Sequence, residues 1–195
     1  MLIKPTKKFL GILVLGLFLI TPSQADDIRD FQIEGMSIGD SLLDYFSEGF
    51  IKQNIAEEEY KSKKFYDVNI YDPSTFNTYL GVQIAIKTND IKYIMHGIDG
   101  LLSYKNNIEQ CYKKRKKIIK ELLTIFNNAK KFDRGKTQHP QDPDSFTTDT
   151  FLTLDSGHKV VISCYDWSKN LESEGYYDQL RISLWTKELN DWLVR

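Results

Sequence analysis

The sequence predicts an α+β fold, in which an antiparallel sheet of about five to six strands packs against one long helix and shorter helices on one face. Several short segments alternate apolar and polar residues and are separated by turn residues, which favours strands joined by hairpins. A longer segment, residues 107–129, repeats its apolar residues with helical spacing and therefore predicts the long helix.

The composition is that of a folded and nearly neutral protein. The 195 residues are 41% hydrophobic and 13% aromatic, which excludes a wholly disordered chain. The 26 basic residues are balanced by 27 acidic ones, so the charge gives no support to nucleic-acid binding. Two cysteines are too few for a disulfide-dense scaffold or a four-cysteine zinc site. No residue pattern indicates a cofactor or a metal.

Residues 1–25 have the three parts of a secretory signal peptide. Basic residues come first, an apolar run follows at 9–20, and small residues at Ser23 and Ala25 predict cleavage after Ala25. The apolar run is shorter than the roughly 20 residues that a membrane-spanning helix needs. We expect residues 26–195 to fold as a single domain without a stable membrane span. Because abundant Lys, Ile, Asn and Tyr point to a bacterium, the periplasm is the expected location, with the extracellular medium as the alternative.

The N-terminal half of this domain predicts short helices followed by strands. Ser37 and Asp40 resemble a capping box, so a helix is expected to begin there. The clearest strand is 79–88, in which large apolar residues alternate with small or polar ones. Weaker strand segments flank it at 65–71 and 91–98.

The C-terminal half predicts the long helix, a loop, a hairpin and a last strand. The segment 133–148 is polar and contains two prolines, which is typical of a loop. Strand segments at 151–154 and 159–165 flank a turn and so predict a hairpin. A final strand at 180–184 precedes a short helix at 186–193.

Arg115 lies in the middle of the apolar arc of the long helix. A buried guanidinium is costly unless it is paired and hydrogen-bonded. In a binding site, its planar fork would anchor a carboxylate or a phosphate. The alternatives are a structural ion pair or a side chain that reaches the rim of the core.

Cys111 on the long helix and Cys164 on a strand are predicted to face the same interior. Two such thiols pair in an oxidising compartment, so the sequence predicts a Cys111–Cys164 disulfide. Two separate buried thiols are the alternative.

All three tryptophans lie close to the C-terminus. Trp167, Tyr176 and Trp185 are candidates for an aromatic platform that binds a small ligand. The alternative is ordinary packing between the terminal helix and the sheet.

Residues 33–42, Ile-Glu-Gly-Met-Ser-Ile-Gly-Asp-Ser-Leu, resemble the Gly-Met-Ser/Thr helix start of small envelope proteins. These include lipoproteins that assist outer-membrane assembly and whose fold is similar to β-lactamase-inhibitor protein. The resemblance implies helices packed on an antiparallel sheet and a role in binding other proteins. It carries over no functional residue, and the lipid-attachment cysteine of those lipoproteins has no counterpart here.

We therefore expect a soluble binding protein of the bacterial envelope, without catalysis, whose partner is another envelope protein or a small ligand. A small periplasmic hydrolase that uses Arg115 with acids such as Asp40 or Asp166 is one alternative, although the sequence motifs of the well-marked enzyme classes are absent. A structural domain of an envelope assembly is another. An enclosed polar cavity with two or more facing carboxylates would argue for the enzyme.

Overall fold

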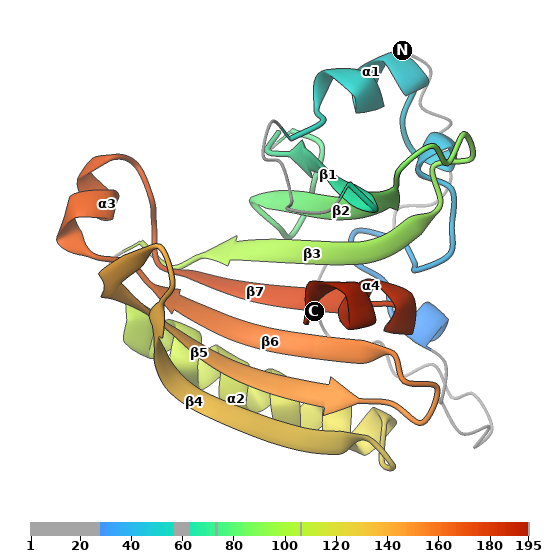
Figure 1. Cartoon of the computed structure of the whole chain (residues 1–195). Helices are drawn as coiled ribbons and strands as arrows, with labels where there is room; N and C mark the ends of the chain where they lie inside the picture. The colour runs from blue at the N-terminus through green and yellow to red at the C-terminus, as the bar shows by residue number, and fades with distance from the viewer. Residues whose placement is uncertain (1–27, 57–62, 73, 106, 195) are drawn as a thin grey trace.

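The computed structural model describes residues 28–56, 63–72, 74–105 and 107–194. The predicted signal peptide, residues 1–25 with cleavage after Ala25, lies outside these ranges. The described residues form one antiparallel sheet with helices on both of its faces, which confirms the α+β fold (Figure 1).

The sheet has seven strands rather than the five to six expected, in the order β1-β2-β3-β7-β6-β5-β4. The strands are β1 (Phe65–Ile70), β2 (Gly81–Lys87), β3 (Met95–Ser103), β4 (Lys130–His139), β5 (Asp142–Thr153), β6 (Lys159–Asp166) and β7 (Gln179–Trp185). The last strand in the chain lies in the middle of the sheet, where it pairs with β3 on one side and β6 on the other. It therefore joins two three-stranded halves that are each continuous in sequence.

Four α-helices accompany the sheet in the described residues. They are α1 (Glu48–Gln53), α2 (Ile108–Ile125), α3 (Lys169–Ser173) and α4 (Lys187–Leu193). The predicted long helix is α2, and the Asn107 side chain caps its start by accepting a hydrogen bond from the backbone N–H of Gln110 (3.3 Å). No helix among the described residues combines the length and the apolar character that crossing a membrane requires.

One face of the sheet forms the main core. Its central row consists of fully buried aliphatic side chains on neighbouring strands: Ile84, Ile98, Leu184, Val160 and Leu152. Helix α2 covers this face over β6 and β7 (Figure 1). The alternation of apolar and polar residues in β2, β6 and β7 is therefore explained by a sheet with only one apolar face.

The N-terminal segment covers the other half of the same core. Ile28 and Leu42 are fully buried in the cluster that also contains the aliphatic row. The Glu34 carboxylate fixes this segment by accepting hydrogen bonds from the backbone N–H groups of Thr78 (2.6 Å) and Tyr79 (3.0 Å).

Helix α4 departs from the prediction that the helices share one face. It lies on the polar face of the sheet, opposite α2 (Figure 1). Gly97 of β3 makes this packing possible, because a Cβ atom there would lie 2.5 Å from Cδ2 of Leu189 on α4. The buried cluster of Phe65, Ala85 and Leu189 is consequently separate from the main core.

The prediction that a helix begins at Ser37 is also wrong. The predicted contact is present, since the Ser37 N–H donates to Asp40 Oδ2 (3.1 Å), but it closes a turn. Gly39 has φ +92°, outside the helical region, and its N–H donates to the Met95 carbonyl (3.0 Å). The backbone thus bonds to the chain at β3, and only a 3₁₀ turn at Leu42–Asp44 and the short helix α1 follow.

The loop predicted for residues 133–148 is wrong, since β4 and β5 form a hairpin there. β4 is an edge strand and is largely exposed, so its polar side chains need no alternation. Pro143 lies in the part of β5 that precedes its pairing with β6, which begins at Phe146.

The predicted disulfide is confirmed. Cys111 of α2 is bonded to Cys164 of β6, and both residues are fully buried. The bond ties the long helix to the sheet within the core.

Glu188 holds α4 to the sheet through two lysines. Its Oε1 accepts from Nζ of Lys87 (2.8 Å) and of Lys64 (2.9 Å), and these bonds lower the pKa of Glu188 from 4.5 to about 2. Because the pKa is lower in the folded protein, the ionised carboxylate stabilises it above about pH 5, and this contribution disappears as the pH falls towards 2. We expect Glu188→Gln to lower the melting temperature at pH 7 and to have no effect near pH 2.

Urea titrations of the two proteins between pH 7 and pH 2.5 test this expectation. Glu174→Gln is a suitable control, since Glu174 is exposed and accepts a hydrogen bond from the side-chain amide of Asn170 (3.3 Å). An unfolding difference between wild type and Glu188→Gln that does not change with pH would contradict it.

Candidate functional site

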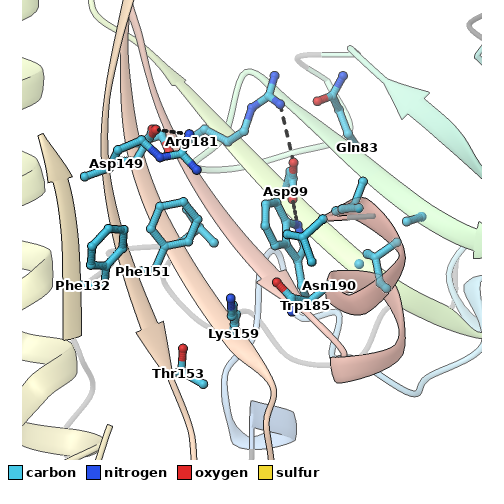
Figure 2. A pocket seen from close by; sticks show the side chains of 18 of the residues that line it. Gln83, Asp99, Phe132, Asp149, Phe151, Thr153, Lys159, Arg181, Trp185 and Asn190 are labelled. Carbon is cyan, nitrogen blue, oxygen red and sulfur yellow. Dashed lines mark hydrogen bonds and ion pairs between the residues drawn. The ribbon is translucent and has the colours of Figure 1, made fainter. Parts of the chain in front are cut away.

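A groove of about 630 Å³ lies on the polar face of the sheet. Strands from both halves of the sheet form its floor, and residues of α4 and of the β4–β5 hairpin form its walls (Figure 2). Its lining combines charged side chains with aromatic rings, and the volume lies within the range of roughly 300–1,000 Å³ typical of small-molecule sites.

The strand alternation explains why these side chains gather here. In β7, Leu180, Ile182 and Leu184 point into the main core, so the residues between them, among them Arg181, face the groove. The register then brings Asp99 of β3 to the same face, since it pairs with Ser183 of β7.

Arg181, Asp99 and Trp185 form a polar cluster on the floor. Arg181 Nη1 lies 3.6 Å from Asp99 Oδ2, and Trp185 Nε1 donates to Asp99 Oδ1 (3.2 Å; Figure 2). Burial raises the pKa of Asp99, although Arg181 and the hydrogen bonds oppose the rise. Burial acts to lower the pKa of Arg181, but Tyr165 and Asp99 outweigh it and the net change is upward.

A second charged pair lies towards the β4–β5 hairpin. Arg134 Nη1 is 3.5 Å from Asp149 Oδ2, and its guanidinium lies over the ring of Phe151, 4.9 Å from the centroid. Asp149 is buried and also accepts from the Thr147 hydroxyl (3.2 Å). The carboxylates of Asp99 and Asp149 are thus both engaged by neighbouring side chains, and Asp67 of β1 is a third carboxylate in the lining.

Lys159 of β6 is the third cation of the groove. It pairs in register with Trp185 of β7, and its amine lies 5.8 Å from the centroid of the Phe151 ring (Figure 2). None of the carboxylates in the described ranges lies within ion-pair distance of this amine.

The predicted aromatic platform is divided between two places. Trp185 lines the groove, whereas Trp167 and Tyr176 pack against each other beside it, with ring centroids 5.2 Å apart. Tyr165 connects them, because it stacks on Trp167 (5.4 Å) and lies under the Arg181 guanidinium (4.9 Å). Tyr165 therefore links the lining of the groove to the Trp167–Tyr176 pair, which lies outside that lining.

Arg115 belongs to α2 and therefore lies on the opposite side of the sheet from the groove. It is buried, donates from Nε to the Ile162 carbonyl (3.2 Å) and from Nη2 to the Thr150 hydroxyl, and pairs with Asp133 (3.6 Å). Burial lowers its pKa, and the nearby Asp133 carboxylate acts against this change. These contacts agree with the alternative interpretation of Arg115 as a member of a structural ion pair.

The acids proposed as partners of Arg115 have other contacts. Asp40 accepts from the Tyr45 hydroxyl (2.7 Å), and Asp166 pairs with Lys136 (2.8 Å). The structure does not assemble these acids with Arg115 into one site.

Sequence reasoning missed Asp99, Lys159 and Arg181. The available signal was that these residues alternate with core residues. They lie within or next to the predicted strands at 91–98, 159–165 and 180–184. That signal gives the face but not the order of the strands, so it could not have shown that the three side chains share a groove.

The carboxylates of the groove lie on strands that are not neighbours. The strands of Asp99 and Asp149 are three steps apart, which separates their backbones by about 14 Å, and those of Asp67 and Asp99 are two steps apart, or about 10 Å. A pair of catalytic carboxylates in a glycosidase is roughly 5–9.5 Å apart. No histidine lines the groove, and within the residues that the structure describes no three His, Cys, Asp or Glu gather as a metal site.

Comparisons with protein families, curated proteins and solved structures found no match to this chain. The resemblance of residues 33–42 to small envelope proteins therefore stays a prediction. The function must be argued from the geometry of the groove.

Proposed function

We propose that this protein is a binding protein that holds a small ligand in the groove on the polar face of its sheet and does not transform it. The observation that supports this most is the groove itself, whose volume of about 630 Å³ and mixture of charged and aromatic side chains fit a small organic molecule. The carboxylates of Asp99 and Asp149 are held by neighbouring groups, and they and Asp67 lie on strands that are not adjacent, which speaks against the hydrolase alternative.

We further propose that the protein works outside the cytoplasm, in the periplasm or alternatively in the medium. The signal-like residues 1–25 and the buried disulfide support this location, because structural disulfides persist in oxidising compartments.

Nuclear magnetic resonance provides a direct test, because the indole N–H of Trp185 points at Asp99 in the groove. We expect at least one of three probes of similar size to shift this resonance saturably: 1-naphthylacetate, 1-naphthylacetamide or 2-(1-naphthyl)ethylamine. Trp185→Phe identifies the resonance among those of the three tryptophans.

Two serine-to-phenylalanine variants, one on the floor of the groove and one far from it, provide a matched comparison of probe binding. Ser163 lies on that floor next to Arg181, so Ser163→Phe is expected to weaken probe binding about tenfold or more, which corresponds to roughly 1.4 kcal/mol. Ser173→Phe, on exposed α3, is expected to leave binding unchanged. If no probe shifts the Trp185 resonance, the groove is not a small-ligand site.

A further inference from the structure

The cations of the groove have unused hydrogen-bonding capacity. Arg181 Nε is buried and has no partner, and the closest approach of this guanidinium to Asp99 is 3.6 Å, longer than a hydrogen bond. Arg134 similarly approaches Asp149 at 3.5 Å. Nε itself lies out of a ligand's reach, but the Arg181 side chain is 24% exposed, so a ligand acceptor at the guanidinium can supply a hydrogen bond that Asp99 does not.

Lys159 contributes a charge without a counterion. Lys159 is a partly exposed residue of the groove floor, with the Phe151 ring on one side and Trp185 on the neighbouring strand, and no carboxylate of the described ranges pairs with its amine. An ammonium group without a carboxylate beside it gains from a ligand anion at short distance.

The carboxylates offer no such vacancy. Asp99 accepts from Trp185 Nε1, and Asp149 accepts from the Thr147 hydroxyl, so each already has a donor besides its arginine. Asn190 Oδ1 is a buried acceptor without a partner in the same groove, but it is neutral. Asp67 is a third carboxylate of the groove, and its charge acts on Arg181. Among these groups, Lys159 is therefore the one whose charge no carboxylate of the described ranges matches.

The apolar part of the groove lies next to Lys159. Phe151, Trp185 and Leu189 line this end, and the exposed ring of Phe132 lies 6.1 Å from that of Phe151. Flat aromatic surfaces beside an ammonium group suit a molecule that joins an anionic group to a flat apolar body.

We infer that the groove binds an organic carboxylate with an aromatic or similarly flat apolar body. Lys159 anchors the carboxylate, the rings of Phe151 and Trp185 contact the body, and the free donors of Arg181 bind a second acceptor group of larger ligands. This inference rests on the proposed function, since it names the ligand class of the same groove.

The three naphthyl probes separate charge from shape. We expect 1-naphthylacetate to bind about tenfold more tightly than the neutral amide, and the amine to bind most weakly, as judged by titration of the Trp185 resonance. Raising the salt concentration should weaken the acetate more than the amide.

Variants of Lys159 then locate the anion. Lys159→Met should remove the preference for the acetate over the amide, while Lys159→Arg should retain most of it. Lys116→Met, on the exposed side of α2, should behave as wild type. Amide binding within twofold of the acetate, or an unchanged preference in folded Lys159→Met, would overturn the inference and leave the proposed function standing. Failure of all three probes would instead overturn the proposed function.

Discussion

Cys111→Ala/Cys164→Ala is expected to unfold with a free energy about 4 kcal/mol lower than that of the wild type. The bond closes a loop with a sequence separation of 53 residues, and the loss of chain entropy in the unfolded state accounts for a contribution of about this size. For a domain of this length the change corresponds to a fall in melting temperature of about 10 °C. Both positions are fully buried, so each alanine also leaves a small void.

Reduction of the wild-type protein supplies the control. Wild type unfolded and refolded in dithiothreitol should melt near the temperature of the double variant, and the reductant should not affect the variant itself. A double variant within about 1 kcal/mol of the oxidised wild type would show that the bond adds little to stability.

Arg115→Met is expected to lower the free energy of unfolding by about 2–3 kcal/mol and to leave probe binding in the groove unchanged. The substitution removes the donors to the Ile162 carbonyl and the Thr150 hydroxyl, both of which are buried in the core. Asp133 is about half exposed (48%), so water can solvate its carboxylate when Arg115 is absent. The loss of this ion pair therefore contributes less to the fall in the free energy of unfolding.

Two further variants test this interpretation of Arg115. Asp133→Asn should destabilise the protein less than Arg115→Met, because it leaves the two buried acceptors satisfied. Arg115→Lys should fall between wild type and the methionine variant, since a single amine cannot reproduce the planar fork. A stable Arg115→Met protein that no longer binds the naphthyl probes would make Arg115 a ligand-binding residue.

The elements that could be predicted are those with strong local periodicity. Helix α2 follows from one apolar arc, β2 follows from strict alternation, and the pairing of Cys111 with Cys164 follows from the two periods together. The hairpin at 133–148 could not be predicted, because an exposed edge strand carries polar residues without alternation. The helix expected at Ser37 does not form, because residues 37–40 close a single turn and Gly39 and Asp40 then exchange backbone hydrogen bonds with Met95 of β3.

The candidate site was predictable only in part, because it exists only once the strands are ordered. Trp185 was identified from its residue type, and the structure places it in the groove. Asp99, Lys159 and Arg181 are unremarkable charged residues in sequence, and the pairing of β7 with both β3 and β6 is what brings them together. Arg115 stood out because it lies on an apolar arc, and its contacts are those of a core residue.

The position of β7 also has a consequence for how the protein acquires its structure. Because residues 179–185 join the two halves of the sheet, neither half can complete its backbone pairing until the chain has been made through β7. A nascent chain that lacks this strand keeps the edges of β3 and β6 open and stays loosely organised. Such delayed assembly would favour the export that we propose, since a chain crosses a translocation pore unfolded.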